Sequence, residues 1–307
     1  MGENNGDIEK MIYYLLMCVA ISFTTLNGTM LHKFSNRGLK NTGDIFLFNG
    51  VMNFVWAIIL LLFSFVTGGL HFNAPTLLFS IAYAVILCGY QLFKCLSFAS
   101  GPISLTTLIA NCAFLITTAY AFFVENESVS MIQLIGIVLL LGALLLCINP
   151  KAKNTNDNMK ITFRWFMFAM SLFLCGGGVG VIYRVFGRSS VSQNATSMLF
   201  CAAIISSALL ILMAFVTNKI GLNSKPCLSK TPLIYALICG ITGCIYIRMN
   251  ISLSAVIPSV IFFPVSNGAT VILSSVIGWM LFKEKLVRQQ IVGIIIGMVA
   301  IVCIGCF

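Results

Sequence analysis

The chain has 307 residues, of which 59% are hydrophobic and only 8% are charged, and its formal net charge is +10. A soluble domain carries about 25% charged residues, so this composition excludes a soluble globular protein. Apolar runs of roughly 20 residues recur along the chain, and each is long enough to span a bilayer. Barrel strands would instead alternate over about 10 residues. The sequence therefore predicts an all-α polytopic membrane protein.

The basic residues lie in short loops between the apolar runs, where such residues orient helices in the membrane. The positive charge therefore indicates no nucleic-acid partner; the expected surroundings are the lipid bilayer of a cell membrane, plasma or inner. Eleven of the 12 cysteines fall inside apolar runs, as buried small hydrophobes do. Their spacing predicts no metal site, and no cofactor is expected.

Ten spans are predicted in chain order. Their ranges are 11–32, 45–67, 76–98, 102–124, 130–149, 162–186, 193–217, 232–252, 257–282 and 288–307. A polar linker, 150–161, separates a first five-helix unit, 1–149, from a second, 162–307. Pro102 and Pro258 stand at the first turns of spans four and nine, where a missing N–H costs nothing. Spans three and four, and likewise eight and nine, are expected to form tight hairpins.

A short motif occurs once in each half: Glu, five residues, Gln, two residues, Gly, followed by an apolar run. The first copy has Glu127, Gln133 and Gly136, and the second begins at Glu284, 157 residues later. Five spans per copy is an odd number, so the two copies must cross the membrane in opposite senses. The expected architecture is thus two inverted five-helix repeats, from which many secondary transporters are built.

Loop charges predict the orientation. Odd-numbered loops hold 13 of the 18 Lys and Arg residues, whereas the N-terminal tail and the even loops hold only Lys10, Arg184 and Arg188. The positive-inside rule then places the odd loops in the cytoplasm and both termini outside.

Both halves resemble the drug/metabolite transporter superfamily, in its ten-span EamA-like branch. The resemblance rests on residues 89–136 and 241–297, each a glycine-containing helix, a short turn, a long helix and the Gln-x-x-Gly helix. It implies two repeats that transport a small solute. Members usually place both termini in the cytoplasm, opposite to the loop charges, and the usual mid-helix proline of the long helix is absent from 102–124.

Two charged residues fall clearly inside spans, Lys94 in span three and Arg248 in span eight, at nearly matching places in the two repeats. A charge within a span costs at least about 2.5–3.5 kcal/mol on insertion scales, so it is usually retained for a use. One interpretation is a site for an anion or carboxylate near the pseudo-twofold axis. The other is that each side chain snorkels to a headgroup or bonds a helix carbonyl. Both interpretations stay open.

Asn111 and Asn267 also nearly match, each about nine residues into spans four and nine. They either line the central pathway or bond across packed helices, and both interpretations stay open. On the first interpretation the pathway also has Thr107, Gln91, Tyr90 and Tyr246; the two tyrosines are placed inside because they share the helices of Lys94 and Arg248.

Residues near span ends are given structural roles. Arg184 is interpreted as an interfacial anchor, and Glu127 and Glu284 as caps of the helices that follow them, in preference to proton coupling. The glycine run 176–180 is interpreted as tight helix packing rather than as a flexible cavity wall.

The expected function is secondary transport of a small polar metabolite, such as an amino acid or organic anion, by alternating access; no enzyme activity is predicted. Lys94 and Arg248, with no acid inside the spans, favour an anionic or zwitterionic solute. The alternatives are a multidrug or cation exporter of the same superfamily, or a passive pore or ligand-sensing membrane protein. The expected partner is a small-molecule substrate; a coupling proton or counter-substrate, and a monomer or homodimer, stay open.

Overall fold

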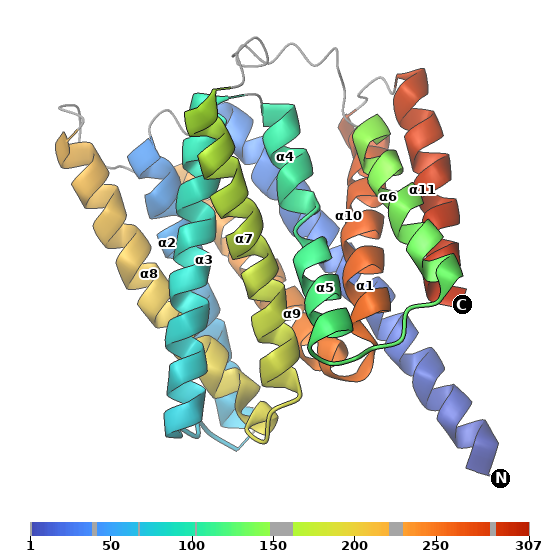
Figure 1. The fold of residues 1–307 in the computed structure, drawn as a ribbon. Helices are drawn as coiled ribbons and strands as arrows, with labels where there is room; N and C mark the ends of the chain where they lie inside the picture. The colour runs from blue at the N-terminus through green and yellow to red at the C-terminus, as the bar shows by residue number, and fades with distance from the viewer. Residues whose placement is uncertain are drawn as a thin grey trace.

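The computed structural model describes residues 2–38, 42–66, 68–101, 103–147, 162–220, 230–282 and 287–306. Over these residues the chain is helical, without strands, and the predicted all-α fold is confirmed for them. The elements are α1 (Gly2–Gly38), α2 (Thr42–Val66), α3 (Ala74–Ser100), α4 (Ile103–Asn111), α5 (Phe114–Phe123), α6 (Met131–Cys147), α7 (Phe163–Gly187), the 3₁₀-helix η1 (Ser192–Asn194), α8 (Ala195–Ile220), α9 (Lys230–Val256), α10 (Ser259–Phe282) and α11 (Arg288–Cys306) (Figure 1).

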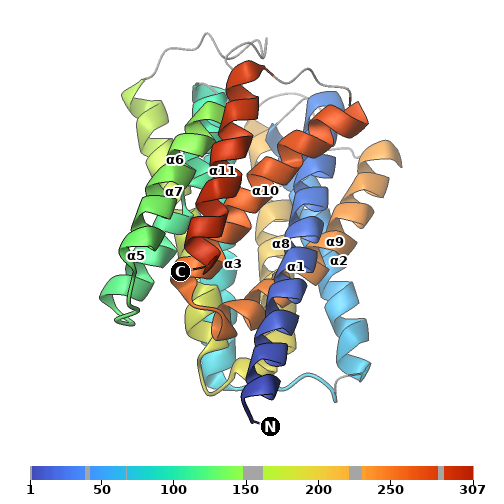
Figure 2. The same ribbon diagram turned by 90° about the vertical axis from the view of Figure 1, so that its right-hand side faces the viewer.

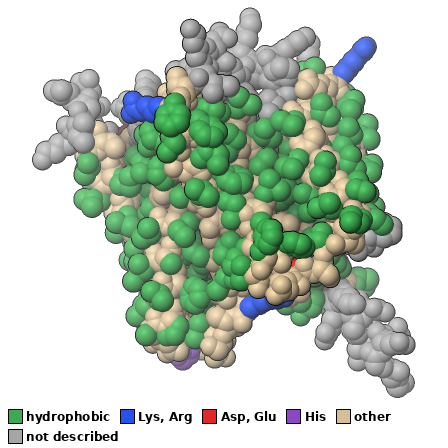
Figure 3. All heavy atoms as spheres, viewed as in Figure 1, with side chains coloured by type: hydrophobic (Ala, Val, Ile, Leu, Met, Phe, Trp, Pro, Cys, Tyr) green, Lys and Arg blue, Asp and Glu red, His purple; other side chains and the backbone are tan. Residues whose placement is uncertain are grey.

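Nine helical stretches of the described chain are long and apolar enough to cross a membrane, and one of them, Leu105–Phe123, includes most of α4 and all of α5. α6 is apolar but has only 17 residues, or about 25 Å at 1.5 Å per residue. Hydrophobic side chains cover most of the face seen in Figure 3, which suits lipid as the neighbour. The chain is therefore a multi-pass membrane protein.

Both predicted hairpins are present. α3 ends at Ser100 and α4 begins at Ile103, while α9 ends at Val256 and α10 begins at Ser259. Pro258 lies just before α10 rather than within its first turn, and its carbonyl accepts the N–H groups that start that helix. Pro102 lies outside the described residues.

The predicted span 102–124 is not one continuous helix. It is broken between α4 and α5, where the backbone tightens: the N–H of Ala113 bonds to the carbonyl of Ala110 at 3.3 Å, and that of Leu115 to Cys112 at 2.9 Å. These i to i−3 bonds are of the 3₁₀ type. The break comes directly after Asn111, near the middle of the span, without a proline or glycine at the break itself.

The helices pack in pairs that combine the two halves of the chain. α2 lies along α8, α6 along α11, α1 against α9, and α3 against α7. Figures 1 and 2 both show α6 and α11 side by side at one edge of the molecule, next to α10. The N-terminus and the C-terminus lie at the same end, the lower end in Figure 1, where α5, α7 and α9 also finish.

The contacts between α6 and α11 repeat themselves at an offset of 157 residues. A Cβ added at Gly136 would lie 3.1 Å from the carbonyl oxygen of Ala300 in α11. A Cβ added at Gly293 would lie 3.0 Å from the carbonyl oxygen of Ala143 in α6. Gly136 and Gly293, and likewise Ala143 and Ala300, are 157 residues apart. Each motif glycine therefore allows the backbone of the other helix to approach closely.

A second pair on the same offset joins α2 and α8. The hydroxyl of Ser207 donates a hydrogen bond of 2.8 Å to the carbonyl of Gly50, and these residues are 157 apart. Beside that bond, Asn53 of α2 donates to the hydroxyl of Ser206 of α8 at 3.0 Å. Both helix pairs thus contain contacts between residues that are related by an offset of 157.

Candidate functional site

A small apolar cavity of about 10 Å³ lies between α2, α3, α8 and α9. A cavity of this size holds about one water molecule, so it is no site for a metabolite as it stands. Its lining residues are Trp56, Leu60, Tyr83, Leu87, Leu199, Ala203, Cys244 and Ile247. The indole N–H of Trp56 is buried without a hydrogen-bond acceptor, but it is packed against Gly243 of α9 and does not face the cavity.

Four tyrosines gather near this cavity. The hydroxyls of Tyr83 on α3 and Tyr183 on α7 are hydrogen-bonded at 3.0 Å, and their ring centroids are 5.7 Å apart. Tyr246 lies on α9, one residue before the cavity-lining Ile247. The sequence placed Tyr90 and Tyr246 inside the central pathway, and both side chains are half-buried. Tyr83 and Tyr183, whose place the sequence left undecided, are buried more deeply.

Lys94 is half-buried on α3, and its ammonium lies 5.8 Å from the centroid of the Tyr90 ring, one turn earlier on the same helix. This distance is within the range of a cation–π contact. Tyr90 in turn borders the break in span four, because a Cβ added at Gly176 of α7 would lie 3.4 Å from the Tyr90 ring and 2.9 Å from the Cβ of Ala113. Lys94, Tyr90 and the break therefore adjoin one another.

Arg248 is half-buried on α9, one residue after the cavity-lining Ile247. One terminal nitrogen of its guanidinium donates to the hydroxyl of Ser252, one turn further along the helix. Its Nε–H is buried without an acceptor. The described polar partners of Arg248 and Lys94 are different residues on different helices, so their joint action on one solute stays a prediction.

The two asparagines lie in different surroundings. The side-chain amide of Asn267 donates to the carbonyl of Phe263 at 2.8 Å, within its own helix, so that bond crosses to no other helix. Asn111 is the half-buried last residue of α4, at the break. Gln91 is half-buried on α3 and Thr107 is exposed on α4. Whether these four residues line a pathway stays a prediction.

The glycine run of α7 is a packing surface. A Cβ added at Gly177 would collide with the side chain of Ile116, and one added at Gly180 with that of Thr117, both on α5. The interpretation as tight helix packing is therefore favoured by the contacts: the glycines let α7 lie against the broken span four.

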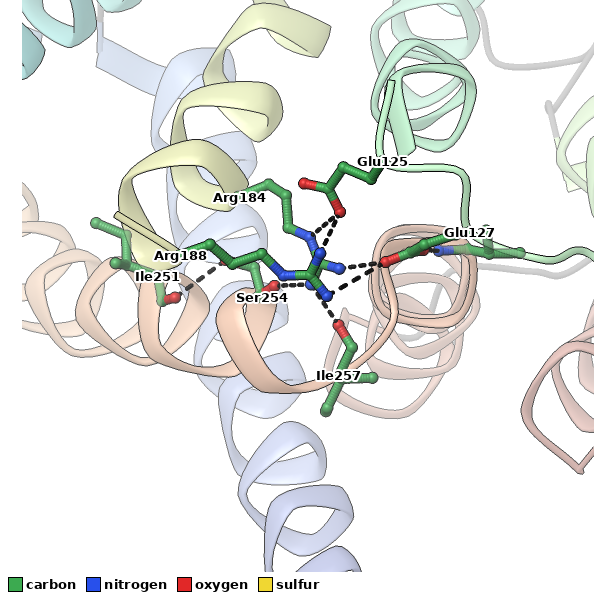
Figure 4. Close-up of polar contacts among 8 residues, drawn as sticks. Glu125, Glu127, Arg184, Arg188, Ile251, Ser254 and Ile257 are labelled. Carbon is green, nitrogen blue, oxygen red and sulfur yellow. Dashed lines mark hydrogen bonds and ion pairs between the residues drawn. The ribbon is translucent and has the colours of Figure 1, made fainter. Parts of the chain in front are cut away.

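Arg184 is the centre of an ionic cluster at the end of the molecule that holds both termini (Figures 1 and 4). Its side chain is 1% exposed. Its Nε donates to Glu125 at 2.9 Å and its terminal nitrogens donate to Glu127 and to the carbonyls of Ser254 and Ile257. The interpretation as an interfacial anchor is wrong: this guanidinium bonds protein groups on every side rather than reaching the membrane surface.

Glu127 does not cap the helix that follows it, contrary to the sequence-based interpretation. Its second oxygen accepts from the N–H of Val260 at 3.3 Å, in the first turn of α10, where the helix dipole favours a negative charge. Asn126, with φ of 53°, forms the left-handed turn between the two glutamates, a conformation asparagine tolerates. Glu284 lies outside the described residues.

The motif glutamine closes the start of the following helix in both copies. Gln133 accepts from the N–H of Ser130 at 3.0 Å while Ser130 accepts from the N–H of Gln133 at 3.2 Å, which is a capping box. Gln290 likewise accepts from the N–H of Val287 at 3.1 Å, and it also donates to the carbonyl of Cys147 on α6 at 3.2 Å.

No protein-family model matches the chain, and a search of the curated proteins finds no match. One solved structure, described as "Crystal structure of protein", has the same fold, with a TM-score of 0.77 over 96% of this chain and 97% of that chain. The two sequences are 15% identical. This likeness shows a shared fold along nearly the whole length, and it does not indicate an activity.

Proposed function

We propose that this protein is a secondary transporter for a small anionic or zwitterionic metabolite, and that it works by alternating access between two inverted five-helix repeats. The single observation that carries the proposal is the recurrence of contacts at one sequence offset. Gly136 and Gly293 make corresponding contacts between α6 and α11, and Gly50 and Ser207 meet directly. Such self-matching pairs are expected where two copies of a unit face each other across a twofold axis.

A further pair of contacts supports the same axis. Asn27 on α1 donates to the carbonyl of Cys239 on α9 at 2.7 Å, and Tyr183 on α7 is hydrogen-bonded to Tyr83 on α3. Tyr183 lies 156 residues after Asn27, and Cys239 lies 156 residues after Tyr83. In this proposal α6 is the fifth span and completes a set of ten, because it forms the counterpart of α11.

The central residues support a polar solute that carries negative charge. Lys94 and Arg248 contribute positive charge within the spans. The acids of the described chain lie at helix ends or in a loop: Glu3, Asp7 and Glu9 at the start of α1, Asp44 at the start of α2, and Glu125 and Glu127 between α5 and α6. The Nε–H of Arg248 is a buried donor without an acceptor. An unmade hydrogen bond of a buried donor costs about 1–3 kcal/mol, which a bound acceptor would recover.

Transport is tested in two stages. Purified protein is first screened for ligands that raise its melting temperature, across amino acids, organic acids, sugars and cations, because a ligand stabilises the state that binds it. The best ligand is then loaded into proteoliposomes as a radiolabelled solute. A carrier gives saturable uptake and counterflow, whereas a passive pore gives neither.

Charge recognition is tested with Lys94→Gln and Arg248→Gln in the same vesicles. Losing a charge-assisted bond of about 1.5–3 kcal/mol lowers affinity by roughly 10- to 150-fold, so we expect a raised KM for each variant. Arg288→Gln, at an exposed position at the start of α11, is the control and leaves uptake unchanged. The charge proposal fails if both span variants transport the identified solute normally.

A further inference from the structure

The Arg184 cluster joins three parts of the chain at one end of the molecule. Arg184 comes from the last turn of α7, and Glu125 and Glu127 come from the loop between α5 and α6. The bonded carbonyls are those of Ser254, in the last turn of α9, and Ile257, in the turn between α9 and α10 (Figure 4). The two glutamates belong to the first five-helix unit and the other groups to the second. The ion pairs therefore tie one unit to the other.

The cluster lies between the central cavity and this end of the molecule along α9. Cys244 lines the cavity, and Ser254 follows it by ten residues on the same helix, a distance of about 15 Å at 1.5 Å per residue. Gly187 of α7 packs tightly against α9, because a Cβ added at Gly187 would lie 2.9 Å from the carbonyl oxygen of Ile251. The ends of α7 and α9 are thus held together at the level of the ion pairs.

The corresponding place in the first unit holds no charge. At the offset of 156 that relates Tyr183 to Asn27, the counterpart of Arg184 is Gly28, which has no side chain. A glycine occupies one copy of the position, and a guanidinium paired with two carboxylates occupies the other. The repeat is therefore asymmetric at the point where its two units are tied.

The arrangement also allows the ion pairs to separate. If the glutamates move away with the first unit, Arg184 keeps the carbonyls of Ser254 and Ile257, so its charge is not left without acceptors. Arg188, whose side chain is 46% exposed, already bonds Glu125 at 2.7 Å and lies 3.7 Å from Glu127. It can hold the carboxylates while they pass into water, which lowers the cost of breaking a buried pair.

We infer that Arg184, Glu125 and Glu127 form an ionic latch that holds the terminus-bearing face of the molecule closed, and that its release opens the central cavity to that face. The latch is inferred from the fold alone. Only the interpretation of its opening as a step of transport rests on the proposed function. Neutralising either glutamate shifts the population toward molecules open on this face.

The native Cys244 reports the opening without any substrate. Protein in lipid nanodiscs is treated with a charged, water-soluble methanethiosulfonate reagent, and labelling of each cysteine is followed by mass spectrometry. We expect Glu127→Gln and Glu125→Gln to raise the labelling rate of Cys244 at least about fivefold, a population shift of about 1 kcal/mol. Asp44→Asn, an acid in the first turn of α2 at the other end, leaves the rate unchanged.

Cys88 separates opening from unfolding, because it is buried in a different cluster with Phe46, Leu210 and Ala214. Faster labelling of Cys244 with Cys88 unchanged supports the latch. Faster labelling of both cysteines, or of neither in both variants, overturns it. If Cys244 responds but no solute shows counterflow, the latch holds and the carrier proposal fails, so the two proposals are judged separately.

Discussion

At the scale of single residues, Arg184 shows how a full charge is accommodated inside a helical membrane protein. Two carboxylates and two backbone carbonyls surround it, and the carbonyls belong to the end of α9 and the turn after it. A helix C-terminus carries partial negative charge, so this position favours a cation beyond the individual bonds. The side chain is therefore held by groups from three segments at once.

Replacing Arg184 should destabilise the fold strongly. Arg184→Gln leaves two partly buried carboxylates without their main partner, and removing one member of a buried pair costs about 3–5 kcal/mol. Arg188→Gln removes an exposed partner of the same glutamates and should cost at most about 1 kcal/mol. Thermal unfolding followed by intrinsic fluorescence in detergent measures both, and equal losses would contradict the assignment of Arg184 as the buried centre.

Sequence reasoning missed this cluster because its members are up to about 130 residues apart and each has an adequate local explanation. A signal was present: Glu125 and Glu127 occupy one even-numbered loop, and Arg184 and Arg188 lie at the entrance to the next, so the predicted topology put both at one end. Local roles were chosen instead. Lys94 and Arg248, by contrast, were identified from sequence because a charged side chain within a membrane span costs free energy and is therefore conspicuous.

At the scale of helices, the pair α6 and α11 explains what the repeated motif does. Its glutamine closes the first turn of each helix and its glycine receives the backbone of the other helix. The motif is thus part of a helix pair, a role that the sequence did not predict. The role of its glutamate depends on α7 and α10, which no local pattern reveals.

The two glycines of α6 give a matched test of this pairing. Gly136→Ala places a methyl group 2.7 Å from a side-chain carbon of Ile304 and 3.1 Å from the carbonyl of Ala300, whereas Gly142→Ala meets nothing within 4 Å. Overpacking costs about 1–3 kcal/mol, so the first change should lower the melting temperature by several degrees and the second should not. If both variants melt alike, the close approach of α6 and α11 is not a stabilising contact.

The break in span four could not be predicted from sequence. Sharp bends are usually found at proline, at glycine or serine pairs, or where the ladder of backbone bonds is interrupted. Residues 111–114 are Asn, Cys, Ala and Phe, and none of these residue types is typical of a helix break. What distinguishes the site is tertiary: the glycines of α7 allow it to press against Ala113 and Ile116.

At the scale of the whole molecule, composition and apolar run length were enough to predict the class of fold. Charge content alone excludes a soluble domain, and the near absence of loops three and eight fixed both hairpins correctly. The pairing of α2 with α8 and of α1 with α9 was not predicted, because apolar faces in lipid carry little information about their partners. The first of these pairs depends on small residues such as Gly50, where the backbone of α2 approaches that of α8.

Orientation is a prediction for the whole molecule. The helix ends that flank the odd-numbered loops, such as the end of α8 and the start of α11, lie at the end opposite to both termini. Those loops hold most of the basic residues, so the C-terminus should face away from the cytoplasm. An alkaline phosphatase fused after Cys306 should be active in cells, and the same enzyme fused at Lys225, in the loop after α8, should be inactive. The reverse pattern would show that the loop charges do not set the orientation.

The pairing of α6 with α11 also has a consequence for the order of synthesis. α6 ends at Cys147, and α11 begins only at Arg288, so α6 enters the membrane well before its partner exists. At about 5–20 residues per second, that interval is on the order of ten seconds. During this time the glycine face of α6 must be covered by lipid or by a chaperone, and the packing of this helix is completed only when α11, from the second half of the chain, has been made.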